Sequence, residues 1–468
     1  MPQGGFLQSQ TVPGPGGGIP FRAGPVHLSR RVAEVRATPG ADMGGKAVGA
    51  VALACVLGLM ACGQGTPIAP ATAALDGRQH PTAGASWTVL VYMAADTSQE
   101  AQGLEHLREL ADVGSGEGLS IVAQVDRATG YSDAALGNLA DWTTTKRLLV
   151  RPGAFQELAD LGELDMGTAH TLADFIAWGV RAYPADRYAL VVWDPGGAWT
   201  AFGRDEDAPG TATGRDALDL GRLQAGLDSG RSAAGLSQFA LIGFDTGLMA
   251  TYEVAKALSP HGEYLLASEE VEPGHGWDYG ALAVLRQEPS SGPAVLGQRL
   301  LEGYGQRALR EKTQDAVTLS LTDLYALDDL TRAVRRFASL TPESNPTLSE
   351  MVAAARSAAL ELGQSPDAAL AFHLVDLGSL SASLAEQMPH RSSLDVEMQA
   401  ALDRAVVART HGARTSAATG LAIYFPPSLS LYDEGYDTLS DMARWRGFLF
   451  RFLTGRGHLR VEDDAPHG

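Results

Sequence analysis

Residues able to carry chemistry gather after two apolar segments that we predict to be strands. One segment is followed by Asp194-Pro195-Gly196-Gly197 and the other by Asp245-Thr246-Gly247. The second group spells the triplet of aspartic peptidases, and Asp228-Ser229-Gly230 spells a variant of it. Aspartic peptidases need two carboxylates that share a proton, supplied by two β-rich lobes or two subunits. Since the pattern around both triplets is α/β, we interpret the two spellings as coincidence.

Thiol and metal chemistry have few candidate residues. The two cysteines, Cys55 and Cys62, lie within the first apolar stretch, so the rest of the chain has neither a zinc cluster nor a disulfide framework. The histidines lack the H-E-x-x-H spacing of metal sites, and no EF-hand-like acidic loop occurs. Asp205-Glu206-Asp207 could hold a cation, although a solvated loop is the stronger interpretation. We therefore predict no metal site and no required cofactor.

Alternating strands and helices would position these residues. Apolar runs at 87–93, 119–125, 188–193, 239–244 and 264–267 predict buried strands. The predicted helices are 100–111, 168–182, 218–227 and 248–258. This alternation predicts a mostly parallel sheet covered by helices on both faces, with ligands bound at the carboxyl ends of the strands.

The chain becomes more helical after about residue 310. Long periodic segments at 324–340 and 347–362 predict helices, and 316–321 and 421–425 are further strand candidates. We therefore divide the body into an α/β domain at 87–310 and an α-rich C-terminal region at 311–468 that packs on it.

The composition is that of a globular protein with an acidic surface. Of the 468 residues, 45% are hydrophobic, which suffices for a large buried core. The formal net charge is −19, so the chain would repel a phosphate backbone and we expect no nucleic-acid partner. An acidic surface also favours cationic peptides, but its simpler role is solubility.

Residues 43–62 have the layout of a bacterial export signal. A short charged start precedes the mostly apolar or small residues 47–61, which are too few to span a bilayer. Leu59-Met60-Ala61-Cys62 resembles a lipobox, so Cys62 is the predicted lipid attachment and membrane anchor, with a plain signal peptide as the alternative. Residues 1–42 would be an upstream or disordered segment, and 62–86 the lipidated cysteine with a flexible tether. We therefore predict an exported lipoprotein of the bacterial envelope, on the outer membrane or cell surface.

The body of the chain resembles the clostripain family of cysteine peptidases. In order and with family-like spacing, the resemblance is carried by residues 87–96, 124–127, 142, 161–163, 171–178, 188–199, 241–249, 267–279 and 420–426. It implies the three-layer α/β/α sandwich with a mainly parallel sheet that is typical of caspase-like proteins. It also implies an endopeptidase that cleaves after Arg or Lys, and clostripain itself depends on calcium.

Both positions that the family uses for catalysis hold other residues here. A cysteine peptidase needs a thiolate, a histidine that activates it, and backbone donors for the oxyanion. The family histidine lies in a Trp-Asp-His-Gly-Gly-Gly-like stretch and the cysteine in a Phe-Asp-Ala-Cys-Leu-Met-like stretch; this chain has Pro195 and Gly247 at those positions. Proline has no proton to exchange and glycine has no side chain, so the resemblance implies no catalytic residue.

A neighbouring threonine and histidine do not obviously restore the pair. Thr246 is adjacent to Gly247, but a neighbour at a strand end points away from it, and a threonine nucleophile needs a base. His275 follows the next predicted strand and could reach the mouth of the cleft, yet it is more simply a loop histidine. We therefore do not expect a Thr246/His275 pair to replace the dyad.

The chain could still bind substrate although it lacks the catalytic residues of the family. In the family, the aspartate two places before the cysteine is implicated in the acidic pocket that accepts Arg or Lys, and Asp245 has that place here. Glu269 and Glu270 end the next predicted strand and could line the same cleft. The alternative for Asp245 is a carboxylate that caps the following helix, and both interpretations stay open.

Three hypotheses follow for the function. The first is a non-catalytic peptidase homologue that binds a peptide or protein, possibly a basic one, through the old substrate cleft. The second is an active cysteine endopeptidase that cleaves after Arg or Lys. The third is a structural or interaction lipoprotein without a functional cleft. Pro195 and Gly247 favour the first over the second.

Overall fold

A computed structural model describes residues 86–194, 196–200, 217–388 and 392–459. These residues belong to one compact unit, 63–468. The predicted upstream segment, the predicted signal peptide and Cys62 lie outside the described residues, as do Pro195 and Asp205-Glu206-Asp207.

The elements of this unit follow the alternation expected from the sequence. The described strands are β1 (Trp87–Ala94), β2 (Leu119–Asp126), β3 (Lys146–Arg151), β4 (Ala154–Asp160), β5 (Arg187–Trp193), β6 (Phe239–Asp245), β7 (Gly262–Ala267), β8 (Thr318–Asp323), β9 (Glu361–Leu362), β10 (Leu374–Asp376), β11 (Val406–His411) and β12 (Ala422–Tyr424). The described α-helices are α1 (Glu100–Val113), α2 (Ala169–Ala182), α3 (Leu220–Ala234), α4 (Tyr252–Leu258), α5 (Ala283–Gln287), α6 (Pro293–Glu311), α7 (Leu327–Phe337), α8 (Pro346–Ala358), α9 (Leu377–Gln387), α10 (Ser392–Ala405) and α11 (Ala443–Leu459).

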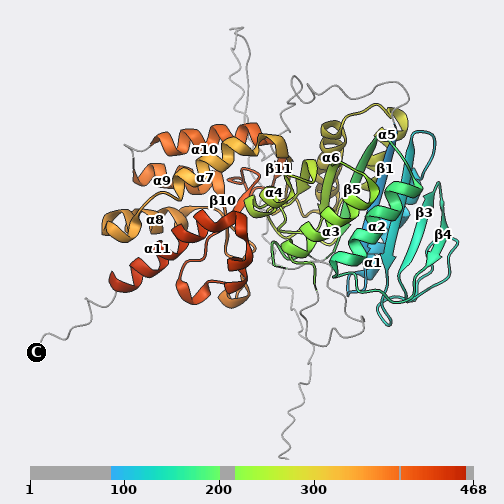
Figure 1. Cartoon of the computed structure of the whole chain (residues 1–468), viewed down its shortest axis with the longest axis horizontal. Helices are drawn as coiled ribbons and strands as arrows, with labels where there is room; N and C mark the ends of the chain where they lie inside the picture. The colour runs from blue at the N-terminus through green and yellow to red at the C-terminus, as the bar shows by residue number, and fades with distance from the viewer. Residues whose placement is uncertain (1–85, 195, 201–216, 389–391, 460–468) are drawn as a thin grey trace, which may run out of the picture. The chain divides into compact units, whose positions relative to one another are not determined.

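A nine-stranded sheet forms the centre of the fold, in the order β11-β8-β7-β6-β5-β1-β2-β3-β4 (Figure 1). The five strands from β7 to β2 in this order run parallel, and the strands at both edges run antiparallel to their neighbours. Parallel neighbours need crossover connections, which is why helices follow the central strands. The predicted α/β/α sandwich with a mainly parallel sheet is confirmed.

Alternate residues of the central strands pack into different cores. In β1, Leu90 and Tyr92 belong to one apolar cluster, whereas Val89 and Val91 belong to another. Successive side chains of a strand point to opposite faces of a sheet, so each cluster lies on one face. Helices α2, α3 and α4 contribute to the first cluster, and α1, α5 and α6 contribute to the second.

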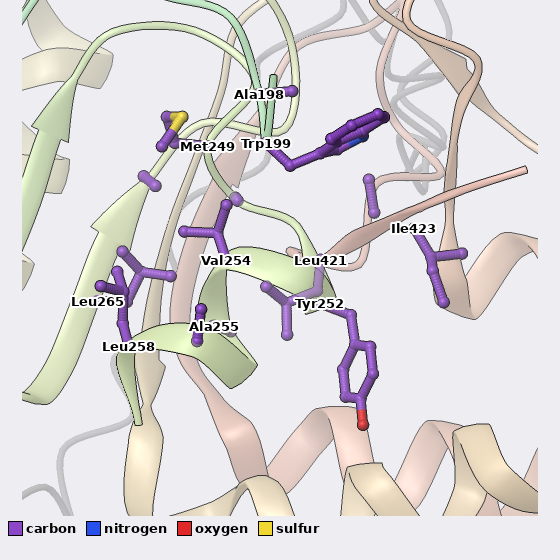
Figure 2. Packing of buried hydrophobic residues seen from close by; sticks show 14 of the residues in the cluster. Ala198, Trp199, Met249, Tyr252, Val254, Ala255, Leu258, Leu265, Leu421 and Ile423 are labelled. Atoms are coloured by element: carbon purple, nitrogen blue, oxygen red, sulfur yellow. The ribbon is translucent and has the colours of Figure 1, made fainter. Parts of the chain in front are cut away.

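The chain after residue 310 shares the first core. β8 and β11 belong to the large sheet, and α7 to α11 bury apolar side chains in the same cluster as α2 to α4. A small antiparallel sheet, β12-β10-β9, adjoins this cluster. Figure 2 shows Leu421 and Ile423 of this region beside the end of α4 that carries Tyr252. The division predicted at residue 310 therefore falls inside a continuous structure.

In the part of the chain that the structure describes, no helix is both long and apolar enough to cross a bilayer.

Candidate functional site

The two segments singled out in the sequence meet at the carboxyl edge of the sheet. β5 and β6 are parallel neighbours, and Trp193 is paired with Asp245 at their ends. Gly196 has a φ of +95°, and a Cβ placed on it would lie 2.5 Å from the Oγ1 of Thr246 and 2.9 Å from the backbone nitrogen of Gly247. The turn after β5 thus packs directly on the turn after β6.

Backbone of a third segment fills the space beside Gly247. A Cβ placed on Gly247 would lie 2.7 Å from the Cα of Val271, 2.9 Å from the backbone nitrogen of Glu272 and 3.2 Å from the carbonyl oxygen of Glu270. Carbon atoms in proteins normally approach to about 3.5–4.0 Å. We call residues 271–274 the strap. The position that the resemblance equates with the family nucleophile therefore has no side chain, and the strap leaves no room for one.

The turn after β6 also separates Asp245 from the next helix. Leu248 has a φ of 69°, a left-handed conformation that is costly for a residue with a side chain. Helix α4 consequently begins at Tyr252, later than the predicted residue 248, and the Oγ1 of Thr251 accepts a hydrogen bond from the backbone N–H of Val254 (3.2 Å). Thr251 caps α4, so Asp245 does not.

Asp245 is instead a buried acceptor. The residue is 4% exposed, and its Oδ1 accepts a hydrogen bond from the backbone N–H of Trp277 (3.0 Å). Its Oδ2 accepts a hydrogen bond from the hydroxyl of Tyr279 (2.8 Å). Burial, and next the charge of Asp245, raise the pKa of the Tyr279 hydroxyl well above its usual value, so this group remains a donor. The loop after β7 therefore holds the carboxylate in place.

Asp245 lines a small cavity together with Glu272, a glutamate that the sequence analysis did not single out. The cavity has a volume of about 50 Å³, and its lining includes His106, Trp193, Thr246 and the strap. Since one liquid water takes about 30 Å³, the space holds about one or two waters. Glu272 could have been noticed from Glu272-Pro273-Gly274, a turn signal directly after a strand.

The carboxyl group of Glu272 is buried beside that of Asp245. Both of its oxygens are inaccessible to solvent. The carboxyl group of Asp245 and the indole N–H of Trp277 lie near enough to affect it, but neither has good hydrogen-bond geometry to it. Burial, and next the charge of Asp245, raise the pKa of Glu272 well above its usual value. Two buried carboxyl groups that face one cavity cannot both ionise without a large cost, so the Glu272 side chain retains a proton to a higher pH.

His106 is the histidine that lines this cavity, and its ring is fully engaged. Its Nε2 lies 2.6 Å from the carbonyl oxygen of His275, which can only accept, so Nε2 carries the proton. Its Nδ1 accepts a hydrogen bond from the indole N–H of Trp193 (2.8 Å) and lies 3.6 Å from the Oδ2 of Asp245. Because both ring nitrogens are hydrogen-bonded, the neutral ring holds its neighbours in position and cannot act as a free base.

Glu269 and Glu270 follow β7, as expected, but they are not among the residues that line the cavity. The Oε2 of Glu269 accepts a hydrogen bond from the backbone N–H of Gly420 (2.9 Å). Burial, and next the charge of Asp376, raise the pKa of Glu269 well above its usual value. The Oε1 of Glu270 accepts hydrogen bonds from the backbone N–H groups of Val271 (2.8 Å) and Gly363 (3.2 Å). Both side chains thus bind backbone of the C-terminal region.

The structure brings neither of the alternative catalytic pairs together. The Nε2 of His275 lies 2.7 Å from the Oγ1 of Thr313, and its Nδ1 lies 2.9 Å from the carbonyl oxygen of Gly276. The Oγ1 of Thr246 has no hydrogen-bond partner among the described residues, so no base is in place to activate it. Asp228 lies in α3, where its carboxylate pairs with Arg231 and His261 instead of Asp245.

A separate acidic cluster lies at the same edge of the sheet. Ligand oxygens of Asp96, Asp126 and Glu163 all lie within 4.8 Å of one another. Asp126 ends β2, and its Oδ1 accepts a hydrogen bond from the hydroxyl of Thr145 (2.8 Å). Calcium takes six to eight oxygen ligands, for which carboxylates are typical. In donor type these three residues fit calcium, the metal on which clostripain itself depends and which the family analogy leaves possible here, with further ligands needed from backbone or water.

Comparisons with known proteins agree with the fold. The model of the clostripain family matches residues 91–449. An inactive zymogen of a C11 protease from Parabacteroides distasonis superposes with a TM-score of 0.57 at 19% sequence identity, covering 77% of this chain and 98% of that chain. A secreted C11 cysteine protease from Bacteroides thetaiotaomicron, iotapain, superposes with a TM-score of 0.57 at 17% identity, covering 77% of this chain and 99% of that chain. A search of curated proteins found no match.

Proposed function

We propose that this chain, which belongs to the clostripain family, is a non-catalytic member that binds basic segments of a peptide or protein through the acidic remnant of the substrate cleft. The observation that carries the proposal is the strap, whose backbone lies where a nucleophile would project from position 247. Family membership supplies the fold and the location of the cleft. The residues of this chain supply the argument for binding without cleavage.

Three features support the loss of catalysis. Position 195 holds proline and position 247 holds glycine, and no cysteine follows Cys62. His106, the histidine lining the cavity, uses both ring nitrogens in hydrogen bonds. Thr246 lacks a base, because His275 contacts Thr313. A peptidase of this class needs both an activated nucleophile and a proton carrier, and neither is in place.

The charge of the cavity supports a basic partner. Asp245 and Glu272 both contribute carboxyl groups to it, and the chain as a whole carries a net charge of −19. An ammonium or guanidinium group that entered would offset the repulsion between two neighbouring carboxylates. With a volume of about 50 Å³ the cavity is too small for a lysine or arginine side chain, so binding requires the strap to move.

The catalytic part of the proposal is tested with fluorogenic Arg- and Lys-containing peptides. Residues 63–468 are compared with the double variant Pro195→His, Gly247→Cys under reducing conditions. We expect no cleavage by the unmodified protein, because it has no nucleophile at position 247. Cleavage by the unmodified protein, after removal of contaminating proteases, would overturn the proposal. Cleavage by the double variant alone would show that the strap can move aside and that the cleft remains usable.

The binding part is tested with uncleaved peptides that contain a single Arg or Lys, measured by calorimetry. Asp245→Asn should weaken binding about tenfold or more, since a charge-assisted hydrogen bond contributes about 1.5–3 kcal/mol. Asp228→Asn is the matched control, because its carboxylate lies in α3 and is not among the residues that line the cavity. Equal affinity for Arg, Lys and Gln peptides would favour a protein whose partner binds elsewhere.

We further propose that the protein is an envelope lipoprotein attached through Cys62. The lipobox-like Leu59-Met60-Ala61-Cys62 supports this location, and iotapain, a structural relative, is a secreted protein. Expression in bacteria fed an alkyne-labelled fatty acid should label the full chain, whereas Cys62→Ala should remain unlabelled. Labelling of the alanine variant would exclude Cys62 as the attachment site.

A further inference from the structure

We propose that the strap is a pH-sensitive gate, which closes the cleft while Glu272 is protonated and opens it when Glu272 ionises beside Asp245. The inference deepens the proposed function, because the gate would regulate access to the same cleft. It assigns to Glu272 a second role besides the charge that it contributes to the cavity: its ionisation decides whether the cleft is available.

The first argument is the geometry of the strap. On its inner side, Glu272 carries its carboxyl group into the cavity, and the backbone at Val271 and Glu272 lies against Gly247. On its outer side, the Val271 residue is 53% exposed. A short segment with one face buried and the other in solvent can leave its site without disturbing either core.

The second argument is that the strap lies between a glycine-containing turn and a fixed anchor. A Cβ placed on Gly274 would meet nothing within 4 Å, and Gly276 has a φ of +53°, which favours glycine. At the other end, the carbonyl oxygen of Glu270 accepts a hydrogen bond from the backbone N–H of Leu248 (3.2 Å), and the Glu270 carboxyl group anchors the chain to Gly363. The segment between these points can therefore swing while its flanks stay fixed.

The third argument is the charge around Glu272. Asp245 lies at the end of β6, and the cavity also contains the neutral ring of His106 from α1. The hydroxyl groups of Tyr279 and of Tyr304, in α6, lie close enough for Glu272 to raise their pKa values, although burial is the larger cause.

Arg307 carries a positive charge in this region, but its guanidinium group already has hydrogen-bond partners. Arg307 of α6 donates hydrogen bonds to the carboxylate of Glu109 (2.6 Å) and to the carbonyl oxygen of Trp277 (2.7 Å). His275 follows the strap, and burial lowers the pKa of its ring, which favours its neutral form. No group among these residues offers Glu272 a free positive charge.

The consequence of ionisation follows from electrostatics. A second negative charge beside Asp245 is unfavourable in the closed cavity, whereas in water it is solvated. Moving the strap outward brings Glu272 into water, so the open fraction should rise by up to about tenfold per pH unit while Glu272 titrates. A cationic side chain of a partner would favour the same open state.

The gate is tested by the reactivity of a buried thiol. Residues 63–468 contain no cysteine, so Thr246→Cys places a single thiol in the cavity beneath the strap. Each alkylation rate is first divided by the thiolate fraction measured for that variant at the same pH, because burial raises the pKa of a thiol. The Thr246→Cys value is then divided by that of Tyr131→Cys, a control at a residue that is 46% exposed. We expect this ratio to rise about tenfold or more as the pH is raised from mildly acidic to alkaline values.

Two carboxyl variants identify the titrating group. In the Glu272→Gln background the ratio should vary by less than about twofold over the same range, because the amide does not ionise. In the Glu350→Gln background the full rise should persist, since Glu350 is an exposed residue of α8 and is not among the residues that line the cavity. An unchanged rise in Glu272→Gln, or no rise without that substitution, would overturn the gate.

A second measurement guards against misfolding of the cysteine variant. Hydrogen exchange of the amides at 271–276 in the unsubstituted protein, corrected for intrinsic rates, should accelerate over the same pH range and should not do so in Glu272→Gln. Neither experiment contains a peptide. If neither measurement shows the pH dependence, the gate is refuted, and peptide binding is still tested separately by calorimetry with Asp245→Asn. If the gate is observed but no peptide binds, only the proposed function is refuted.

Discussion

The contact between the strap and Gly247 predicts a specific cost for the smallest possible side chain at that position. Gly247→Ala would place a Cβ 2.7 Å from the Cα of Val271 and 2.9 Å from the backbone nitrogen of Glu272. Overpacking of this kind costs about 1–3 kcal/mol. Replacing glycine also stabilises by about 0.4–1 kcal/mol through the unfolded chain. We expect a net loss of about 1–2 kcal/mol.

The matched control lies on the strap itself. A Cβ on Gly274 would meet nothing within 4 Å, and Gly274 is not among the glycines with positive φ, so Gly274→Ala should leave stability unchanged or raise it slightly. Both variants are compared with the parent by scanning calorimetry and urea unfolding. The Gly247→Ala protein should unfold at the lower temperature and urea concentration.

The comparison has a clear refuting outcome. If Gly247→Ala is as stable as Gly274→Ala, the strap does not occupy the space beside Gly247 in solution, and the physical argument for a blocked nucleophile position fails. If Gly247→Ala is destabilised and its strap amides also exchange faster, the strap has been displaced as expected. The same contact predicts that cysteine at this position, with one more atom, is at least as costly as alanine.

Two further predictions concern stability. Burial raises the pKa of Glu253, Glu269 and Glu272 above 4.5, the ordinary pKa of a glutamate side chain. Above that pH the folded chain therefore holds protons that the unfolded chain releases. This stabilisation is complete below that value and is lost as pH rises through the raised pKa values, so the unfolding temperature should fall from mildly acidic to alkaline pH; a rise would contradict the assignment. Arg356 donates hydrogen bonds to both carboxylate oxygens of Glu361 (3.1 and 2.6 Å) and to the carbonyl oxygen of Phe425 (3.0 Å). Arg356→Lys should therefore lower the free energy of unfolding in urea by about 1–3 kcal/mol. An unchanged midpoint would show that these hydrogen bonds contribute little.

Periodicity predicted the central sheet well, because buried parallel strands are continuous apolar runs. The predicted strands at 87–93, 119–125 and 239–244 match β1, β2 and β6 to within one residue. The hairpin of β3 and β4 was overlooked, although Pro152-Gly153 between them is a turn signal. Helix α6 was also overlooked. The predicted start of α4 at residue 248 was wrong, because Leu248 takes a left-handed conformation that local propensity does not reveal.

The acidic residues of the site show where sequence reasoning stopped. Asp245 was selected through a family motif, and the structure places it in the cavity. Glu269 and Glu270 were selected because they follow the next strand, yet their carboxyl groups bind the backbone of Gly420 and Gly363. Side chains at a strand end point in alternating directions, and the chain then turns, so nearness in sequence did not indicate which carboxyl group returns to Asp245.

The sequence by itself determined the chemical groups that this protein can and cannot use. Glycine at position 247, proline at 195 and the lack of a cysteine beyond Cys62 are facts of composition that no fold can change. Tertiary structure alone decided that Glu272 returns to the side of Asp245 and that the strap fills the space beside Gly247. The physical reason is that contacts between separate strand ends depend on the path of the connecting loops, which local patterns of hydrophobicity do not encode.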